Sequence, residues 1–400
     1  MTTLNKRLAQ AQPSATYRII DRVAERRAQG VAIISLCAGE PDFDTPQPIR
    51  QAGIDAIRNG HTRYTQVAGV RALREAVAEK FRRENGLDVT WQDTLVSNGG
   101  KHVIYNALAA TLNEGDEVIV PAPYWVSYPE MVELCGGTAK IVACGVEEGF
   151  KLTPAALEAA ITANSRWLIL NSPSNPTGAV YSKSELQALA AVLLKHPHVL
   201  VLADDIYEHL LFDGQTFHTL AQVEPCLASR VLTMNGVSKA YAMTGWRIGF
   251  ATGPRWLLAA MEKLQGQQTS GACAISQHAA IAALNGPQDF VHASRAVFQQ
   301  RRDLVVSLLN ATPGLECLTP SGAFYAFASC AGLLGRTTPA GTLLRTDEDV
   351  AHALLDEANV AVVPGSAFGL APYLRIAYAL DEDALRQACA AIQRFCAATC

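Results

Sequence analysis

The sequence predicts an α/β fold, with a large domain built on a mostly parallel sheet and a smaller α+β domain after it. Five short apolar runs between residues 117 and 234 alternate with segments of helical pattern. Each run is apolar throughout rather than at every second residue, which is typical of strands that are buried on both faces of a parallel sheet. With 400 residues, of which 49% are hydrophobic, the chain is long enough for two domains with large cores.

In chain order, an N-terminal arm and a helix are expected over residues 1–30, followed by a strand over 31–36. Helices are predicted at 48–59 and 70–84, and the many charges of 70–84 indicate a solvated face. The strands of the large sheet are predicted at 94–97, 117–120, 139–143, 167–170, 199–203 and 231–234, with helices from about 101 to 112 and at 126–134, 154–161 and 183–194.

Residues 255–310 are expected to be largely helical. The smaller α+β unit is then predicted from strands at 323–328, 360–363 and 374–377 and helices at 349–357 and 381–395. We therefore expect a large domain over 48–290 and a small domain over 291–400. Residues 1–47 are expected to form an arm and part of the small domain.

The composition disfavours several classes of function. The net charge is -4, without a basic footprint, so nucleic acid is not an expected partner. The ten cysteines include no CxxC pair, which favours a reducing cytoplasm over a disulfide framework. No apolar run approaches the roughly 20 residues of a membrane span, and residues 1–17 lack the apolar core of a signal peptide. His196 and His198 have no third ligand nearby, so no metal site is expected.

The segment 235–249 carries the strongest chemical signal. Lys239 stands between Ser238 and Ala240, directly after an apolar strand, and Arg247 follows eight residues later. Desolvation of a lysine in such a loop favours the neutral amine, which can react with an aldehyde. An arginine offers a fixed fork to a phosphate. Together they suggest pyridoxal 5'-phosphate (PLP), with a simple loop-capping lysine as the alternative.

Further polar residues follow other strands of the predicted sheet. Ligands bind beyond the carboxyl ends of parallel strands, and Asp204, Tyr207 and the segment 171–178 fall there. After the strand at 94–97, the pair Gly99-Gly100 precedes a helix and can offer backbone N–H groups to a phosphate. The spacing is not that of an ATP- or NAD-binding loop.

Two more positions suggest ligand contacts in the smaller domain and its neighbourhood. Arg375 lies inside an otherwise apolar strand, where a charge is costly unless it is paired. A ligand carboxylate would pair it, and an ion pair to a nearby acid is the alternative. Gly39, in the turn-rich loop 37–46, would allow a ligand to approach the backbone, although this composition also fits a plain connection between domains.

Four ordered motifs give the chain a family resemblance: AGEPDFDTP at 38–46, PYWVSYPE at 123–130, NSPSNPTG at 171–178 and AMTGWRIG at 242–249. The chain resembles the class I aminotransferases of PLP fold type I nearly from end to end, and it looks closest to the bacterial aspartate aminotransferase branch. The resemblance implies a seven-stranded sheet in the large domain, PLP as the cofactor and a homodimer with shared active sites.

The resemblance also implies roles for individual residues. Lys239 matches the lysine that bonds to the cofactor aldehyde, and Asp204 matches the acid that keeps the pyridine nitrogen charged. Tyr207 and Asn175 match the groups at the ring oxygen, and Trp125 matches the aromatic residue that stacks on the ring. The phosphate would be held by Gly99, Gly100, Lys101, Ser238, Arg247 and, from the partner subunit, Tyr64. One position departs from many relatives, because Gly236 replaces a serine that often adds a phosphate contact.

For the substrate, Arg375 matches the arginine that binds the α-carboxylate, with help from Asn175, Trp125 and the Gly39 backbone. Lys101 matches a cation for the second carboxylate, beside a hydroxyl supplied by Ser14 or Thr16. We expect ping-pong transamination between aspartate or glutamate and 2-oxoglutarate or oxaloacetate. The alternatives are an aromatic or prephenate aminotransferase and a PLP β-lyase or cyclopropane-forming synthase. A non-enzymatic regulator would need a DNA-binding domain before the motif that starts at residue 38.

Overall fold

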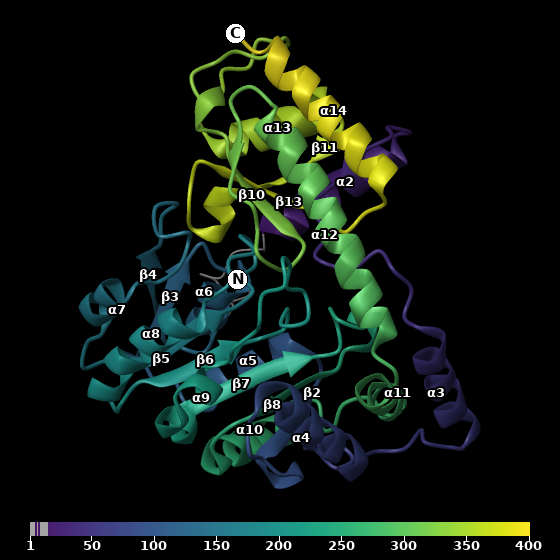
Figure 1. Cartoon of the computed structure of the whole chain (residues 1–400), viewed down its shortest axis with the longest axis vertical. Coiled ribbons are helices and arrows are strands. Elements are labelled where there is room, and N and C mark those ends of the chain that lie inside the picture. The colour runs from purple at the N-terminus through teal and green to yellow at the C-terminus, as the bar shows by residue number, and fades with distance from the viewer. Residues whose placement is uncertain (1–4, 6, 9–14) are drawn as a thin grey trace.

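The computed structural model describes residue 5, residues 7–8 and residues 15–400. Two parts, each with a sheet of its own, lie one above the other in Figure 1. The larger part contains a seven-stranded sheet in the order β2-β8-β7-β6-β5-β3-β4. Its strands are β2 (Thr94–Ser97), β3 (Glu117–Ala122), β4 (Thr138–Ala143), β5 (Ser165–Asn171), β6 (Leu200–Asp204), β7 (Val231–Gly236) and β8 (Gly249–Thr252).

The prediction of a mostly parallel sheet is confirmed. Strands β4, β3, β5, β6 and β7 pair in parallel, whereas β8 is antiparallel to its neighbours β2 and β7. Parallel strands start from the same edge, so the carboxyl ends of β5, β6 and β7 lie together at the edge that faces the smaller part (Figure 1).

Helices cover both faces of the large sheet. Successive residues of a strand point to opposite faces, so each strand contributes side chains to two separate cores. On β3, Val118 belongs to the core formed with α5, α6 and α10, whereas Ile119 belongs to the core formed with α7, α8 and α9. The bounds are α5 (Gly100–Ala109), α6 (Ser127–Leu134), α10 (Arg255–Gln268), α7 (Pro154–Ala160), α8 (Lys183–Lys195) and α9 (Leu220–Val223). At the β2 edge, a third core includes α3 (Gln47–Arg58), α4 (Arg71–Asn85) and α11 (Ala274–Asn285).

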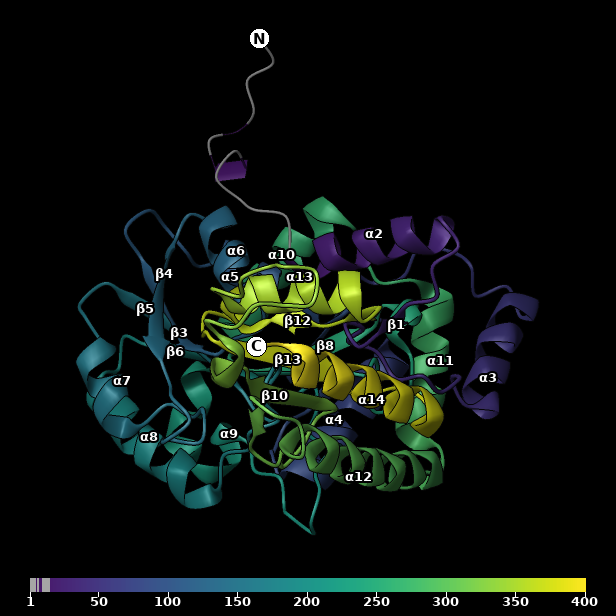
Figure 2. The ribbon, with the colours of Figure 1, turned by 90° about the horizontal axis from the view of Figure 1, so that it is seen from above.

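The smaller part is an antiparallel sheet with helices, as the sequence predicts. Its order is β12-β13-β10-β9, formed by Val363–Pro364, Tyr373–Ala377, Tyr325–Ser329 and Glu316–Cys317. Around it lie α12 (Asp289–Asn310), α13 (Asp347–Glu357), α14 (Glu382–Ala398) and α2 (Ala15–Ala28), as Figure 2 shows from above. Strand β1 (Ile34–Ser35) pairs in parallel with β11 (Val360–Ala361), so the N-terminal segment and the C-terminal part meet.

Two predicted strands are wrong in detail, and two strands, β8 and β9, were missed. The strand expected at 31–36 is only β1, and the strand expected at 360–363 is two short strands, β11 and β12, in two different sheets. Strand β8 escaped prediction because it has four residues and starts with glycine, a poor strand former. That glycine is needed, since a Cβ at Gly249 would lie 2.4 Å from the backbone nitrogen of Gly100.

The structure also contains short 3-10 helices at Trp91–Asp93, Pro225–Arg230, Thr244–Trp246, Ala331–Leu333 and Gly365–Phe368.

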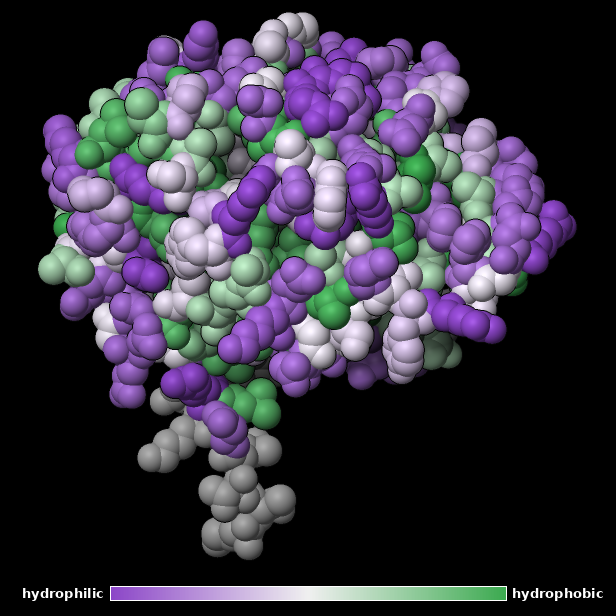
Figure 3. Space-filling model, turned by 90° about the horizontal axis from the view of Figure 1, so that it is seen from below, coloured by the Kyte–Doolittle hydropathy of each residue, from purple (hydrophilic) through white to green (hydrophobic). Residues whose placement is uncertain are grey.

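The outer surface at the end where α4 and α10 lie is mixed in character. Hydrophilic side chains cover much of it and apolar ones occur in several separate groups (Figure 3). Among the helices of the described residues, none has both the length and the apolar character needed to cross a membrane.

Candidate active site

A cavity of about 540 Å³ lies where the carboxyl ends of the parallel strands face the smaller part. Most of the predicted site residues line it together, although they come from segments far apart in sequence. These are Gly39, Gly100, Lys101, Trp125, Asn175, Asp204, Tyr207, Ser238, Lys239, Arg247 and Arg375. Gly99 lies just behind the wall, as the residue before α5.

Lys239 reaches the cavity from the loop after β7. Its Nζ donates a hydrogen bond of 2.6 Å to the carbonyl oxygen of Gly39 and lies 5.8 Å from the centre of the Tyr207 ring. Desolvation lowers the pKa of Lys239 to about 8, and the cations Arg247 and Arg375 lower it further, against the acids Glu40 and Asp204. The amine is therefore poised to be neutral at mildly alkaline pH, as a nucleophile or base requires.

Asp204 is the last residue of β6 and is buried at the floor of the cavity. Its carboxylate accepts hydrogen bonds from the Tyr128 hydroxyl (2.6 Å) and the Ile206 backbone N–H (3.3 Å). Burial raises the pKa of Asp204 to about 6, although these hydrogen bonds and the Lys239 charge lower it. A buried carboxylate in this position needs a cationic partner from the cavity side.

A cradle for an anion lies at the N-terminus of α5. Gly99 has a φ of 88°, and a Cβ there would lie 2.4 Å from Nη2 of Arg247, so only glycine admits the guanidinium at this distance. The Arg247 fork therefore lies beside the first turn of α5, whose N–H groups have no partner within the helix. Packing explains why glycine, rather than the serine of many relatives, occupies position 236. A Cβ there would lie 2.9 Å from the Ile248 oxygen and 3.1 Å from Cδ1 of Ile206.

Arg375 has no acidic partner among the described residues, so the ion pair considered from the sequence is not present. Its guanidinium lies between the rings of Tyr325 and Phe368, 4.8 Å and 4.9 Å from their centres. Nη1 donates to Oδ1 of Asn175 (3.2 Å) and Nη2 to the Cys37 oxygen (2.6 Å), whereas Nε, which is buried, has no partner. A buried cation with an unused donor is suited to a ligand carboxylate.

Lys101 lies at the mouth of the cavity in the first turn of α5. Its Nζ is 4.9 Å from the centre of the Trp125 ring, and no acid among residues 15–400 pairs with it. Desolvation and the nearby Arg247 charge lower the pKa of Lys101. Ser14 lies outside the described residues, as does the side chain of Thr16, the other hydroxyl expected beside Lys101.

Tyr64 does not line the cavity of its own chain. It lies in the loop between α3 and α4, and its side chain is 98% exposed. Full exposure of a large aromatic ring is unusual in a monomer surface. The placement agrees with an expected contact to a second copy of the chain.

Sequence reasoning missed two tyrosines of the cavity. Tyr128, the donor to Asp204, lies within the motif at 123–130, and Tyr325 lies on β10. The hydroxyls of Tyr325 and Tyr207 are 2.8 Å apart. The motif at 123–130 contains Tyr128 but does not show what its hydroxyl contacts, and none of the four motifs contains Tyr325. Each residue acts on a partner that the fold brings from far along the chain.

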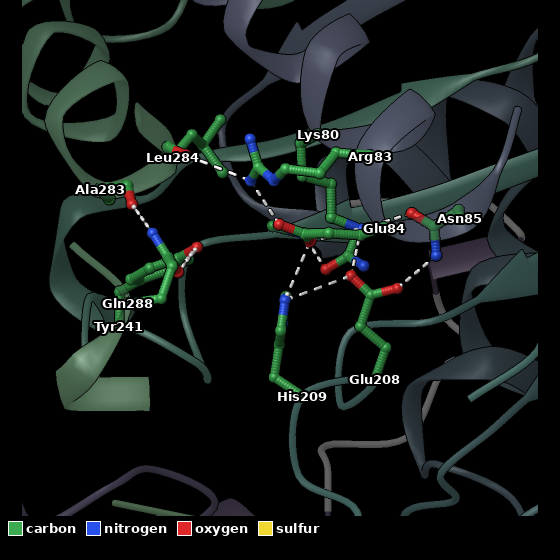
Figure 4. A network of polar contacts seen from close by, with 12 residues as sticks. Lys80, Arg83, Glu84, Asn85, Glu208, His209, Tyr241, Ala283, Leu284 and Gln288 are labelled. Atoms are coloured by element: carbon green, nitrogen blue, oxygen red, sulfur yellow. Dashed lines mark hydrogen bonds and ion pairs between the residues drawn. The ribbon is translucent and has the colours of Figure 1, made fainter. Parts of the chain in front are cut away.

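The expected solvated face of 70–84 is partly wrong, because Lys80 of α4 is only 1% exposed. Its ammonium contacts Oε1 of Glu208, directly after Tyr207, and donates to Oδ1 of Asn85 (2.7 Å), as Figure 4 shows. Asn85 in turn donates to Oε2 of Glu208 (2.6 Å). The site segment 204–208 is therefore anchored from behind by a buried ion pair.

Next to this pair, Glu84, Glu208 and His209 bring three possible metal-ligand atoms within 4.8 Å of one another. Lys80 already supplies a cation to both carboxylates, at 3.7 Å from Oε2 of Glu84. His209 completes the group with a contact of 3.0 Å to Glu84. Arg83 also contacts Glu84, so two cations of the protein, Lys80 and Arg83, lie against the two carboxylates.

The groups around the cavity fit one cofactor. Lys239 can take an aldehyde, Asp204 can pair with a protonated pyridine nitrogen, and the α5 cradle can hold a phosphate. Fold and site thus define a PLP-dependent enzyme. A profile of the family described as aminotransferase class I and II matches residues 31–392. The chain belongs to this family of aminotransferases, which use PLP.

Individual relatives are similar over their whole length. The chain is 56% identical over 398 residues to the "probable aspartate/prephenate aminotransferase" of Rhizobium leguminosarum bv. phaseoli, with 100% of both chains covered. It is similar to the crystal structure of the aspartate aminotransferase from Rhizobium meliloti, with a TM-score of 0.98, 50% identity and 100% of both chains covered. For the aspartate aminotransferase from Thermus thermophilus with maleate, the TM-score is 0.92 at 43% identity, covering 99% of this chain and 100% of that one.

Proposed function

We propose that this aminotransferase exchanges the amino group of aspartate or glutamate with 2-oxoglutarate or oxaloacetate in two half-reactions. The observation that carries the proposal is a pair of cations, Arg375 and Lys101, that line one cavity and have no acidic partner within the described part of the chain. Two such cations suit a substrate with two carboxylates. The names of the relatives from Rhizobium leguminosarum and Rhizobium meliloti, and the dicarboxylate maleate with the Thermus thermophilus enzyme, support this choice.

When bound, PLP supplies an aldehyde that takes the amino group and a ring that accepts electrons from Cα of the substrate. Asp204 would keep the ring nitrogen protonated, and Trp125 would stack on the ring face. Tyr207 and Asn175 would bind the ring oxygen. The backbone of Gly99, Gly100 and Lys101, with Ser238 and Arg247, would hold the phosphate.

Lys239 would move the proton in each half-reaction. Its lowered pKa leaves a substantial fraction of neutral amine, which can take the proton from Cα of the substrate and return it on the cofactor side. Arg375 would fix the α-carboxylate, with Asn175 and the Gly39 backbone beside it, and so point the Cα–H bond toward Nζ.

Lys101 would decide the substrate class. A lysine is disfavoured near a helix N-terminus by the helix dipole, so its place in α5 needs a compensating anion. An ammonium paired with a carboxylate in a closed site contributes about 1.5–3 kcal/mol, or roughly 10- to 150-fold in specificity.

A prephenate or aromatic donor is the second candidate. It is favoured by the name aspartate/prephenate aminotransferase of the relatives from Rhizobium leguminosarum and Cereibacter sphaeroides. Ile20, Ile104 and Trp125 also give the cavity an apolar side that a ring could contact. Arg375 and Lys101 would bind the two carboxylates of prephenate in the same way as those of aspartate.

We also infer a homodimer in which Tyr64 reaches the phosphate of the neighbouring site, because this residue is exposed and does not line the cavity of its own chain. The cytoplasm is the expected compartment, since all ten cysteines are unpaired and seven of them are buried.

The deciding experiment is a panel of amino donors with wild type, Lys101→Ala and a matched control. Lys183→Ala is that control, because Lys183 also lies in the first turn of a helix and is exposed. We expect Lys101→Ala to lower kcat/KM for aspartate roughly 10- to 150-fold and to change alanine turnover little. Equal losses for both donors, or a wild type that prefers alanine, would refute dicarboxylate specificity.

A further inference from the structure

The hydroxyl of Tyr325 occupies a junction between the two parts of the molecule. It lies 2.8 Å from the hydroxyl of Tyr207, and both side chains are buried. A Cβ at Gly39 would lie 2.9 Å from the same hydroxyl, so glycine at that position leaves the space that the Tyr325 phenol fills. No residue role from the family resemblance covers Tyr325.

Three features fix the Tyr325 ring. It is held on β10, which pairs with β13 in the register Tyr325↔Ala377 and Phe327↔Arg375. The guanidinium of Arg375 lies 4.8 Å from the ring centre. Arg375 is itself bonded to the Cys37 oxygen, two residues before Gly39. A ring held in this way has little freedom to turn its hydroxyl away from Tyr207.

The number of available protons determines which hydroxyl donates in the hydrogen bond between Tyr207 and Tyr325. A phenol has one proton to donate, and its oxygen accepts. If Tyr207 is to donate to the ring oxygen of bound PLP, its single proton is not available for Tyr325. Tyr325 must therefore be the donor, and the Tyr207 oxygen the acceptor. Donation in a chain strengthens the next hydrogen bond, because each donor polarises its neighbour.

The charges around the pair favour this order. Arg375, Lys239 and Asp204 are the charged groups that face the two phenols. Burial raises the pKa of Tyr325, and the Arg375 cation stacked on its ring lowers it, because that cation stabilises negative charge on the phenol oxygen. Burial also raises the pKa of Tyr207, to well above its usual value, and Tyr325 and the negative charge of Asp204 raise it further, against the Arg375 cation. The Asp204 charge acts on Tyr207 and not on Tyr325, so Tyr325 is the stronger acid of the two phenols.

We propose that Tyr325 is a positioning residue that donates its hydroxyl proton to Tyr207 and so directs the Tyr207 proton to the ring oxygen of PLP. The inference rests on the proposed function and adds to it a link between the carboxylate-binding arginine and the cofactor oxygen. Arg375 holds the donor ring, Tyr325 orients Tyr207, and Tyr207 contacts the cofactor.

The test is the visible absorbance of PLP-loaded wild type and Tyr325→Phe, titrated with pH. A hydrogen bond donated to the ring oxygen stabilises its anionic form and lowers the apparent pKa of the Lys239–cofactor bond. Loss of the Tyr325 hydroxyl should therefore raise this apparent pKa by roughly 0.3–1 unit. If Tyr207 instead donates to Tyr325, the substitution frees the Tyr207 proton and the apparent pKa falls. A fall, or no change, overturns the proposal.

Two further variants separate positioning from simple packing. Tyr378→Phe is the matched control, because this buried residue does not line the cavity and its hydroxyl donates a hydrogen bond of 3.4 Å to the Ala323 oxygen. This substitution should leave the apparent pKa unchanged. In the Tyr207→Phe background, Tyr325→Phe should add no further shift, whereas a packing effect would shift both backgrounds equally. A wild type that binds PLP but uses no amino donor would overturn the proposed function, and the sign of the shift would still decide the role of Tyr325.

Discussion

The hydroxyl of Tyr128 lies 2.6 Å from Oδ2 of Asp204, and both groups are buried. This hydrogen bond does not offset the burial of the carboxyl, whose pKa is raised to about 6. The folded protein without cofactor therefore binds a proton at Asp204 between about pH 4 and pH 6 that the unfolded chain has already lost. The free energy of unfolding must fall as the pH rises through this window.

Asp204→Asn should accordingly stabilise the cofactor-free protein at pH 8, by roughly 1–3 kcal/mol, and the gain should vanish below about pH 4. Turnover should fall by orders of magnitude, because an amide cannot keep the pyridine nitrogen protonated. Urea unfolding at several pH values measures the first effect and steady-state kinetics the second. Asp213→Asn is the control with the opposite sign, because the Arg302 hydrogen bond lowers the pKa of Asp213. A variant less stable than wild type at pH 8, or near-normal turnover, would contradict this role.

Lys239 should be the attachment point of PLP. Its pKa of about 8 makes it far more often neutral than an ordinary lysine at the same pH. The purified protein should be yellow, and borohydride reduction followed by peptide mapping should place the cofactor on one peptide. Lys239→Ala should lose the label and Lys101→Ala should keep it. A label on Lys101 in the wild type would reverse the assignment.

Tyr64 should act in trans. We expect little activity from Tyr64→Phe or Lys239→Ala alone, whereas mixed and reassociated subunits should form hybrid dimers with one native site. Random pairing gives about a quarter of the wild-type activity per site. Each variant taken through the same procedure alone is the control. A monomer with undiminished activity at high dilution would exclude the shared site.

Lys80→Met should be strongly destabilising, by about 3–5 kcal/mol, because it leaves the buried carboxylate of Glu208 without its cation. The double variant Lys80→Met/Glu208→Gln should recover most of this loss, since no uncompensated charge is left. Lys195→Met, which removes a partner of the exposed Glu158, should cost less than about 1 kcal/mol in the same urea measurements. A loss for Lys80→Met as small as that of Lys195→Met would show that Glu208 does not depend on Lys80.

The sequence predicted the placement of the cavity well, for a geometrical reason. Asp204, Lys239 and the segment 171–178 each follow a strand of one parallel sheet, and parallel strands end at a common edge. Once the strands are recognised by their apolar runs, the meeting of these side chains follows. Arg375 was suspected because a charge stood in an apolar strand, and its unused Nε agrees with that reasoning.

Pairs that act across long sequence separations could not be predicted in this way. Tyr128 and Asp204 are 76 residues apart, and Tyr207 and Tyr325 are 118 apart, and neither pair leaves a periodic pattern. Lys80 looked like part of a solvated helix face, because its ion-pair partner follows a strand of the sheet more than a hundred residues later. Such contacts depend on the packing of complete elements, which local spacing does not encode.

The pairing of β1 with β11 has a consequence for how the chain is made. Ile33, Leu36 and Cys37 are synthesised before the larger part of the molecule, yet they are buried in the finished molecule near strands that are synthesised after it. The sheet partner of β1 and the arginine that bonds to Cys37 are made only after all seven strands of the large sheet. The apolar N-terminal segment therefore stays uncovered while the large domain folds, and it is the stretch that a chaperone would be expected to hold during translation.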